Sequence, residues 1–194
     1  MNGKREVLLL LTDCWSDWEA AYATAYLNGH DDYTVKTVAL DHVPKVSMGG
    51  LRAEIDYDIG NYHNFDNLAM VIMPGGFSWI ENSYPEIAKF TQKLVAKSIP
   101  VAAICNATYF LGEHGFLNHV KHTGNSLEDL QGAQAYQGDK LFISAQAVAD
   151  GGIITANGSA AVEFTYEIFK TLELGGFYED KSEWFDYYKS GAVL

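Results

Sequence analysis

The 194-residue sequence has few cysteines, and its apolar runs are short. Its two cysteines cannot build a disulfide framework, so we expect free thiols in a reducing compartment. The run VLLLLT (7–12) is far shorter than the roughly 18 residues that a membrane helix needs. This run also lacks the small-residue cleavage site of a signal peptide. These absences argue against a membrane or secreted protein and favour the cytoplasm.

Basic residues are also scarce. The sequence has 13 Lys and Arg against 25 Asp and Glu, which gives a formal net charge of −12. Nucleic acids and anionic membrane surfaces are bound by clustered Lys and Arg, so neither is an expected partner. Hydrophobic residues make up 48% and charged residues 20% of the chain, a globular composition. No linker or repeat interrupts it, so we expect one domain spanning residues 1–194.

Apolar runs and amphipathic segments alternate along the chain. Strands are predicted at 5–12, 33–40, 68–76 and 99–105, a hairpin within 45–59, two further strands within 138–158, and helices at 17–28, 84–98, 107–115, 159–174 and 182–191. Most of these strands are apolar throughout, which is typical of parallel strands that are covered on both faces. The prediction is therefore an α/β fold of the doubly wound class, with a mainly parallel sheet and helices on both faces.

Two of the predicted helices carry specific expectations. In the helix at 17–28, Ser16 or Asp17 is expected to cap the first turn, which would place Glu19 within that turn. Gly29 is expected to cap the other end of the same helix. In the helix at 84–98, the apolar face is predicted to consist of Ile87, Phe90, Leu94 and Val95.

A single cysteine stands where a buried strand meets a helix, in VAAICNATYF (101–110). Sites in doubly wound folds form outside the carboxyl ends of the strands, and a residue at such a turn is pushed outward. The N–H groups from Asn106 onward open a helix, so they favour a thiolate, lower the pKa of Cys105 and can hold an oxyanion. The alternative is that Cys105 is only a small buried apolar residue.

Two other corners lie at the same predicted sheet edge. PGGF (74–77) follows a strand, and its glycines allow close backbone approach, although an ordinary tight turn explains them equally well. Glu19 follows the first strand and is either part of the site or a solvated residue favoured by the helix dipole.

Four motifs in order resemble one known family. They are WEAAY (18–22), VIMPGG (71–76), AAIC (102–105) and IITANGSAAVEFTYEI (153–168). The set is similar to the ThiJ/PfpI superfamily of class I glutamine amidotransferase-like proteins. That group includes relatives of the Parkinsonism-associated deglycase and a branch of intracellular proteases and amidases. The resemblance implies a flavodoxin-like fold. It is also compatible with a homodimer.

The resemblance also implies roles for individual residues. Cys105 would be the nucleophile, and the amides of Gly76 and Asn106 would form the oxyanion hole. Glu19 would approach the Cys105 sulfur and share a proton with it, so that the two groups titrate as a coupled pair.

The sequence departs from the family pattern in two places. Peptidase-like members carry His directly after the nucleophile, where this chain has Asn106. Glutaminase members carry a His two residues before a late Glu, but AAVE (160–163) contains none, which disfavours glutaminase activity. His122, in KHTGN (121–125), lies in a segment that approaches the site in some members and is a candidate base. No spacing of residues indicates a metal site or a cofactor.

Two classes of function stay open at this stage. In the first, the Cys105 thiolate attacks a small reactive carbonyl, as in glyoxalases and deglycases, or an amide, as the family label of protease or amidase suggests. In the second, Cys105 serves a non-enzymatic redox sensor or a chaperone-like stress protein. Aromatic residues near the three corners are expected to wall a pocket for a small molecule: Trp15, Trp18, Phe77, Trp79, Tyr109 and Phe110.

Overall fold

The computed structural model describes residues 3–174 and 181–191 of the chain. Its strands are β1 (Arg5–Leu10), β2 (Tyr33–Ala39), β3 (Lys45–Val46), β4 (Arg52–Ala53), β5 (Tyr57–Asp58), β6 (Leu68–Met73), β7 (Val101–Ile104), β8 (Ala147–Asp150) and β9 (Ile153–Ala156). Its helices are α1 (Ala21–Gly29), α2 (Ser78–Glu81), α3 (Pro85–Ala96), α4 (Asn106–Glu113), α5 (Leu127–Gln131), α6 (Ala161–Thr171) and α7 (Lys181–Ser190), with short 3-10 turns at Phe65–Asn67 and Asp139–Leu141.

A single main sheet organises the described chain. Its strand order is β5-β2-β1-β6-β7-β9-β8, and only β8 runs antiparallel to its neighbour. Every residue of β6, β7 and β9 is buried, which is why these strands read as continuous apolar runs. Strand order reverses between β1 and β6, and such a switch point is where doubly wound sheets bind ligands.

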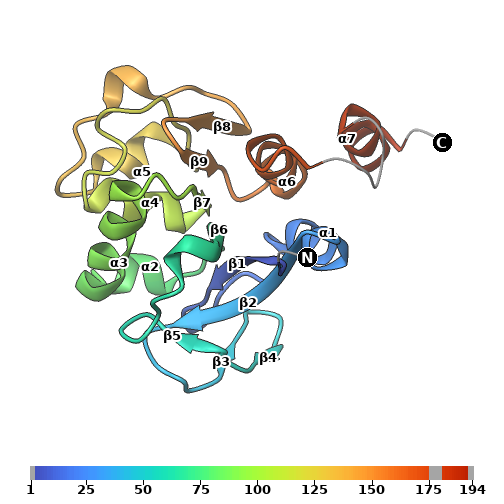
Figure 1. Cartoon of the computed structure of the whole chain (residues 1–194). Coiled ribbons are helices and arrows are strands. Elements are labelled where there is room, and N and C mark those ends of the chain that lie inside the picture. Colours follow the sequence, from blue (N-terminus) through green and yellow to red (C-terminus); the bar gives the residue numbers. More distant parts are fainter. Residues whose placement is uncertain (1–2, 175–180, 192–194) are drawn as a thin grey trace.

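Helices cover both faces of the sheet, as Figure 1 shows. One apolar core lies between the sheet and the helices α2 to α5, and includes Leu94 and Phe110. The second lies on the face covered by α1, α6 and α7, and includes Leu27, Phe164 and Trp184. The predicted fold class, a doubly wound and mainly parallel sheet, is confirmed.

The capping predicted for the first helix is wrong. Helix α1 begins at Ala21, so Glu19 precedes the helix and does not lie in its first turn. Asp17 caps nothing, because its carboxylate accepts hydrogen bonds from Ser47 Oγ and Gly49 N. It thereby ties the β3–β4 hairpin to the loop that follows β1. Gly29 is the last residue of α1 and not its cap.

Of the other local predictions, two are confirmed and one is wrong. The hairpin is confirmed, since β3 and β4 pair antiparallel around Gly49 and Gly50. The turn between β8 and β9 also contains the two expected glycines, Gly151 and Gly152, both with positive φ. Val95 departs from its predicted place on the apolar face of α3, because 43% of it is exposed.

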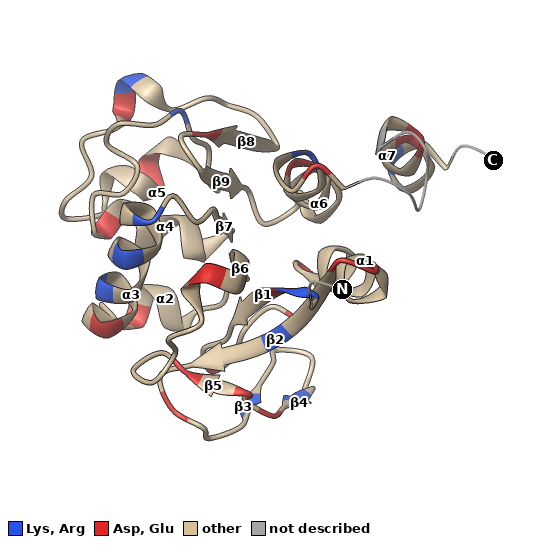
Figure 2. Ribbon diagram, viewed as in Figure 1, with Lys and Arg blue, Asp and Glu red and all other residues tan. Residues whose placement is uncertain are grey.

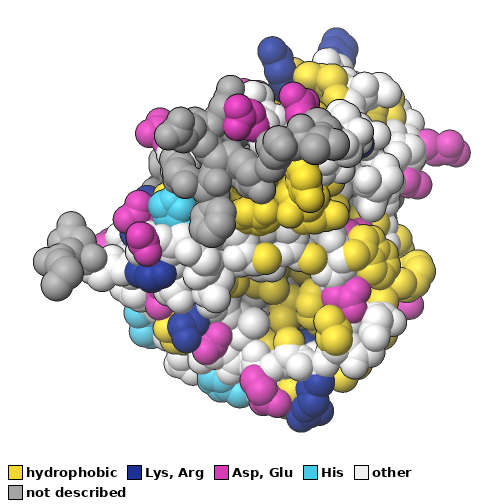
Figure 3. All heavy atoms as spheres, turned by 90° about the vertical axis from the view of Figure 1, so that its right-hand side faces the viewer, with side chains coloured by type: hydrophobic (Ala, Val, Ile, Leu, Met, Phe, Trp, Pro, Cys, Tyr) yellow, Lys and Arg dark blue, Asp and Glu magenta, His cyan; other side chains and the backbone are white. Residues whose placement is uncertain are grey.

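The surface carries no concentrated basic patch in the described chain. Figure 2 shows Lys and Arg scattered over separate elements, as the acidic composition leads one to expect. Hydrophobic side chains reach the surface on the side of the molecule that bears α6 and α7 (Figure 3). Within the described ranges, no helix has both the length and the apolar composition needed to cross a membrane.

Adjacent residues of α3 test the assignment of its buried face. Leu94 is fully buried, so Leu94→Ala should lower the free energy of unfolding by about 2–5 kcal/mol. Val95→Ala should cost less than about 1 kcal/mol, because 43% of Val95 is already exposed to water. Urea denaturation of both variants measures the difference. Equal costs would contradict this placement of α3.

Candidate active site

The carboxyl ends of four adjacent strands meet around Cys105. Glu19 follows β1, Gly75 follows β6, Cys105 follows β7 and Gly158 follows β9. A Cβ atom on Gly75 would lie 2.6 Å from Cys105 Cβ, and one on Gly158 would lie 2.9 Å from Cys105 Sγ. Only glycine allows the backbone to approach the cysteine this closely from both sides, so the sulfur sits in a cradle of main chain.

The backbone of Cys105 has the strained geometry of an outward turn. Its φ of 59° and ψ of −130° are unusual for a residue with a side chain. The surroundings hold this conformation, since Cys105 N donates to Ala156 O at 2.9 Å and Thr108 Oγ1 donates to Cys105 O at 2.6 Å. Such strain at a strand–helix junction is typical of a functional residue.

Glu19 is a buried acid in contact with the thiol. It is 1% exposed, and its Oε2 accepts a hydrogen bond of 2.6 Å from Gly75 N. The carboxyl is also hydrogen-bonded to Cys105 and to Ser16. Burial raises the pKa of Glu19, while these hydrogen bonds act in the opposite direction. The structure therefore brings Glu19 and Cys105 together.

The pKa of the Cys105 thiol is shifted in the opposite direction to the one predicted from the sequence. Burial, followed by the charge of Glu19, raises the pKa of Cys105 to about 11. The N–H of Asn106 lowers that pKa, as expected of a helix start, but burial and the carboxylate outweigh it. Both groups therefore bind their protons more tightly than the free side chains do.

Asn125 is the site residue that sequence reasoning missed. Its Nδ2 donates to Cys105 Sγ at 3.6 Å and to Asn106 Oδ1 at 3.1 Å, and its Oδ1 accepts from Gly158 N at 2.9 Å. It belongs to the segment 121–125, in which only the histidine stood out. The carboxamide at this position could have been noticed in the sequence, because such a group can donate a hydrogen bond to a thiolate but cannot take up the proton of a thiol.

His122 is not available to that thiol. It is fully buried, and its Nδ1 bonds to Val120 O while its Nε2 bonds to Tyr136 Oη, both at 2.8 Å. A carbonyl only accepts, so Nδ1 carries the proton and Nε2 accepts from the tyrosine. Burial also lowers the pKa of His122. Both nitrogens are engaged in the fold, and the structure does not bring His122 to Cys105.

Of the two residues predicted to form the oxyanion hole, Asn106 contacts the thiol and Gly76 contacts Asn106. Asn106 N–H is hydrogen-bonded to Cys105, and Asn106 Nδ2 donates to Gly76 O at 3.2 Å. Gly76 has a φ of +146°, and a Cβ there would lie 2.6 Å from Cys14 O. Gly76 is thus fixed between the nucleophile corner and the loop after β1.

A cavity of about 240 Å³ opens beside the sulfur. It is lined by Ile80, Cys105, Asn106, Thr108, Tyr109, Asn125, Asp129 and Leu130. Of the six aromatic residues expected to wall a pocket, only Tyr109 lines this cavity. Trp79 and Phe110 are core residues, whereas Trp18 and Phe77 are 50% and 59% exposed.

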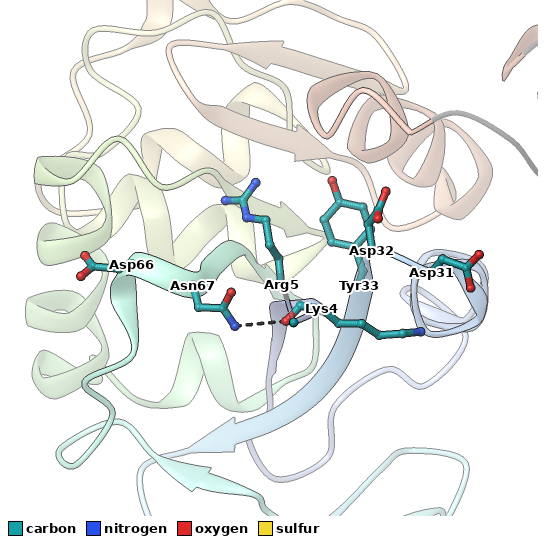
Figure 4. Close-up of a pocket in the computed structure, with 8 residues that line it drawn as sticks. Lys4, Arg5, Asp31, Asp32, Tyr33, Asp66 and Asn67 are labelled. Atoms are coloured by element: carbon teal, nitrogen blue, oxygen red, sulfur yellow. Dashed lines mark hydrogen bonds between the residues drawn. The ribbon is translucent and has the colours of Figure 1, made fainter. Parts of the chain in front are cut away.

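A larger groove, of about 600 Å³, lies at the opposite edge of the sheet. It contains Arg5 and Tyr33, which begin β1 and β2, and Figure 4 shows its polar lining. Lys4 Nζ donates to His30 O at 2.7 Å, and Asn67 Nδ2 donates to Lys4 O at 3.1 Å, so this lining holds loops together. In the described part of the chain, no group of three or more His, Cys, Asp or Glu residues is arranged to hold a metal ion.

Comparison with known proteins agrees with this geometry. Residues 5–171 match the model of the DJ-1/PfpI family. The chain belongs to this family. The resemblance drawn from the four ordered motifs is thereby confirmed.

Several relatives of this DJ-1/PfpI chain are similar over nearly its whole length. A Bacillus subtilis protein named "Uncharacterized protease YdeA" is 38% identical over 170 residues, which cover 87% of this chain and 84% of the relative. The structure of the DJ-1 superfamily protein Atu0886 from Agrobacterium tumefaciens superposes with a TM-score of 0.88 at 30% identity, covering 96% of this chain and 98% of that one. A ThiJ/PfpI family protein from Bacillus anthracis gives a TM-score of 0.88 at 30% identity, covering 97% and 92%.

The coupling of Glu19 and Cys105 predicts a pH effect. Glu19→Gln removes the charge that raises the pKa of Cys105, so the thiol should ionise roughly 1–3 pH units lower than in the native protein. The rate of iodoacetamide alkylation against pH measures this shift, with the adduct located by peptide mass because Cys14 is also an exposed free thiol. Glu81→Gln, at an exposed residue of α2, is the control. A shift to higher pH would mean that Glu19 is protonated and donates to the thiolate.

The glycine cradle predicts a steric effect. Gly158→Ala places a methyl group 2.9 Å from Cys105 Sγ and 3.4 Å from Asn125 Oδ1, so the sulfur must move. We expect alkylation of Cys105 to slow about tenfold or more, since misplacements near 1 Å have large effects on reacting groups. Gly29→Ala is the control, because a Cβ there meets nothing within 4 Å. An unchanged rate would show that Gly158 does not constrain the sulfur.

Proposed function

We propose that this DJ-1/PfpI protein is a cysteine-nucleophile enzyme for small reactive carbonyls of the glyoxal type. The observation that supports this choice is the Glu19 carboxyl, which is hydrogen-bonded to Cys105 and supplies the acid–base group of the site. His122, the other candidate base, is engaged by Val120 and Tyr136. A carboxyl can carry the proton of a thiol during addition to an aldehyde, which is a strong electrophile.

The proposed reaction begins with transfer of the thiol proton to Glu19 as the sulfur adds to the aldehyde carbon. The N–H groups of Gly76 and Asn106 hold the oxyanion that forms on the carbonyl oxygen. Glu19 then gives its proton to this oxyanion, which leaves a hemithioacetal on Cys105 and returns Glu19 to the carboxylate form. With a 2-oxoaldehyde, Glu19 next moves the former aldehyde C–H proton to the neighbouring carbonyl carbon, while the hemithioacetal hydroxyl proton passes to the oxygen of that carbonyl. The product is a 2-hydroxy thioester on Cys105. Water hydrolyses this thioester to a 2-hydroxy acid, so the balance requires one water and no redox cofactor.

Peptide hydrolysis fits the site less well, although two relatives are named as uncharacterized proteases. An amide is a weaker electrophile than an aldehyde, and its leaving group must receive a proton that Glu19 alone of the candidate groups could supply, because His122 is engaged elsewhere. A cavity of about 240 Å³ also suits a small substrate better than a peptide chain. Both cysteines are free thiols, so the proposal places this chemistry in the reducing cytoplasm.

A second candidate function is that of a redox sensor. Cys105 is half-buried, and Asn125 Nδ2 and Asn106 N–H both donate to its sulfur, as they would to the oxygens of a sulfinate. This role needs no base and no substrate beyond a peroxide.

Turnover assays separate these functions. We expect loss of methylglyoxal that Cys105→Ala abolishes and that Glu19→Gln lowers about 10²-fold or more, beside negligible casein hydrolysis. Cys14→Ala, which removes the exposed thiol, should keep full activity. Efficient casein cleavage that depends on Cys105 would overturn the proposal. No loss of methylglyoxal, together with ready Cys105 sulfinate formation in dilute peroxide, would favour the sensor.

A further inference from the structure

The cavity beside Cys105 contains one carboxylate without a counter-charge. Asp129, on α5, lines the cavity together with the nucleophile and lies exposed to solvent. None of the residues lining the cavity is Lys, Arg or His. Within the described chain, no ion pair or hydrogen bond to the Asp129 carboxylate is formed, whereas its backbone N–H donates to Ser126 Oγ at 3.0 Å.

The other polar side chains of this lining are already used by the fold. Thr108 Oγ1 donates to Cys105 O, and Tyr109 Oη donates to Gly132 O at 3.2 Å. The amide of Asn106 bonds to Gly76 and Asn125, and the amide of Asn125 also reaches Gly158 and the sulfur. Asp129 is the charged side chain of this lining, and its carboxylate forms no hydrogen bond within the described chain.

Apolar groups also line this cavity. Leu130 is buried at 1% exposure, while Ile80 is 56% exposed and Tyr109 is fixed by its hydrogen bond. A ligand in this cavity thus meets the thiol, hydrocarbon, an aromatic ring and an exposed carboxylate. Asp129 disfavours an anionic substituent that lies near it, because like charges repel.

We propose that the substrate of this site carries a cationic group, a protonated amine or a guanidinium, which pairs with Asp129 while the carbonyl meets Cys105. This inference rests on the proposed function for the identity of the reacting group. It narrows that function to carbonyl compounds with a positively charged end and excludes those that bear a carboxylate or a phosphate. Asp129 acts here as a specificity-determining residue, and its pairing should weaken as salt is added.

The test uses two thiol reagents that differ in charge. Aminoethyl methanethiosulfonate is a cation and sulfonatoethyl methanethiosulfonate is an anion; with either, the thiolate sulfur forms a disulfide and methanesulfinate leaves. The Cys14→Ser background makes Cys105 the only cysteine of the chain. The ratio of cation to anion rates cancels the thiol pKa, because both reagents consume the same thiolate.

We expect Asp129→Asn to lower this rate ratio about fivefold or more, roughly the factor for two unit charges about 4 Å apart in water. Asp129→Lys should reverse the preference. Glu128→Gln is the control, since Glu128 is the exposed acidic neighbour on α5 and does not line the cavity. A ratio unchanged in Asp129→Asn, or lowered equally by Glu128→Gln, would overturn the inference.

The experiment also separates this inference from the proposed enzyme. The reagents report how a charged group approaches Cys105 and do not depend on turnover. A protein without activity on methylglyoxal can therefore still show the Asp129 effect. Conversely, suppose that the enzyme is active but its ratio of cation to anion rates does not depend on Asp129. This result would support the proposed function and contradict the inference that the substrate is cationic.

Discussion

A buried carboxyl and a half-buried thiol are held against each other in this protein, and the N–H of Gly75 fixes the carboxyl at 2.6 Å. Two hydrogen-bonded acids cannot both ionise easily, so burial and the charge of Glu19 together raise the pKa of Cys105 to about 11. In the proposed reaction, Glu19 receives the thiol proton as the new bond forms.

The fold brings Glu19 and Cys105 together by placing four strand ends side by side. Each strand contributes a group of a different kind: a carboxyl after β1, glycine backbone after β6 and β9, and the nucleophile after β7. Asn125 then joins the last two corners with hydrogen bonds to Asn106 and Gly158. Only a parallel sheet brings residues so distant in sequence to one edge in this way.

The sequence was informative where a local pattern has one physical explanation. Continuous apolar runs identified the parallel sheet, and a cysteine at a strand end identified the corner where Glu19, Gly75 and Gly158 meet. The predicted cap of α1 is wrong because Asp17 instead accepts hydrogen bonds from Ser47 and Gly49, which are distant in sequence. The direction of the Cys105 pKa also failed, since burial and the approach of Glu19 are tertiary effects. Asn125 was missed because its three partners come together only in the folded chain.

Gly158 follows β9, the last strand to be synthesised, and this order has a consequence for the nascent chain. During synthesis Cys105 emerges well before β9, so its sulfur has neither the full cradle nor the amide of Asn125 held in place by Gly158. Until β9 joins the sheet, neither Gly158 nor the Asn125 amide that bonds to it can hold the sulfur in place. The surroundings of the thiol are therefore finished only by the last strand of the sheet to be synthesised.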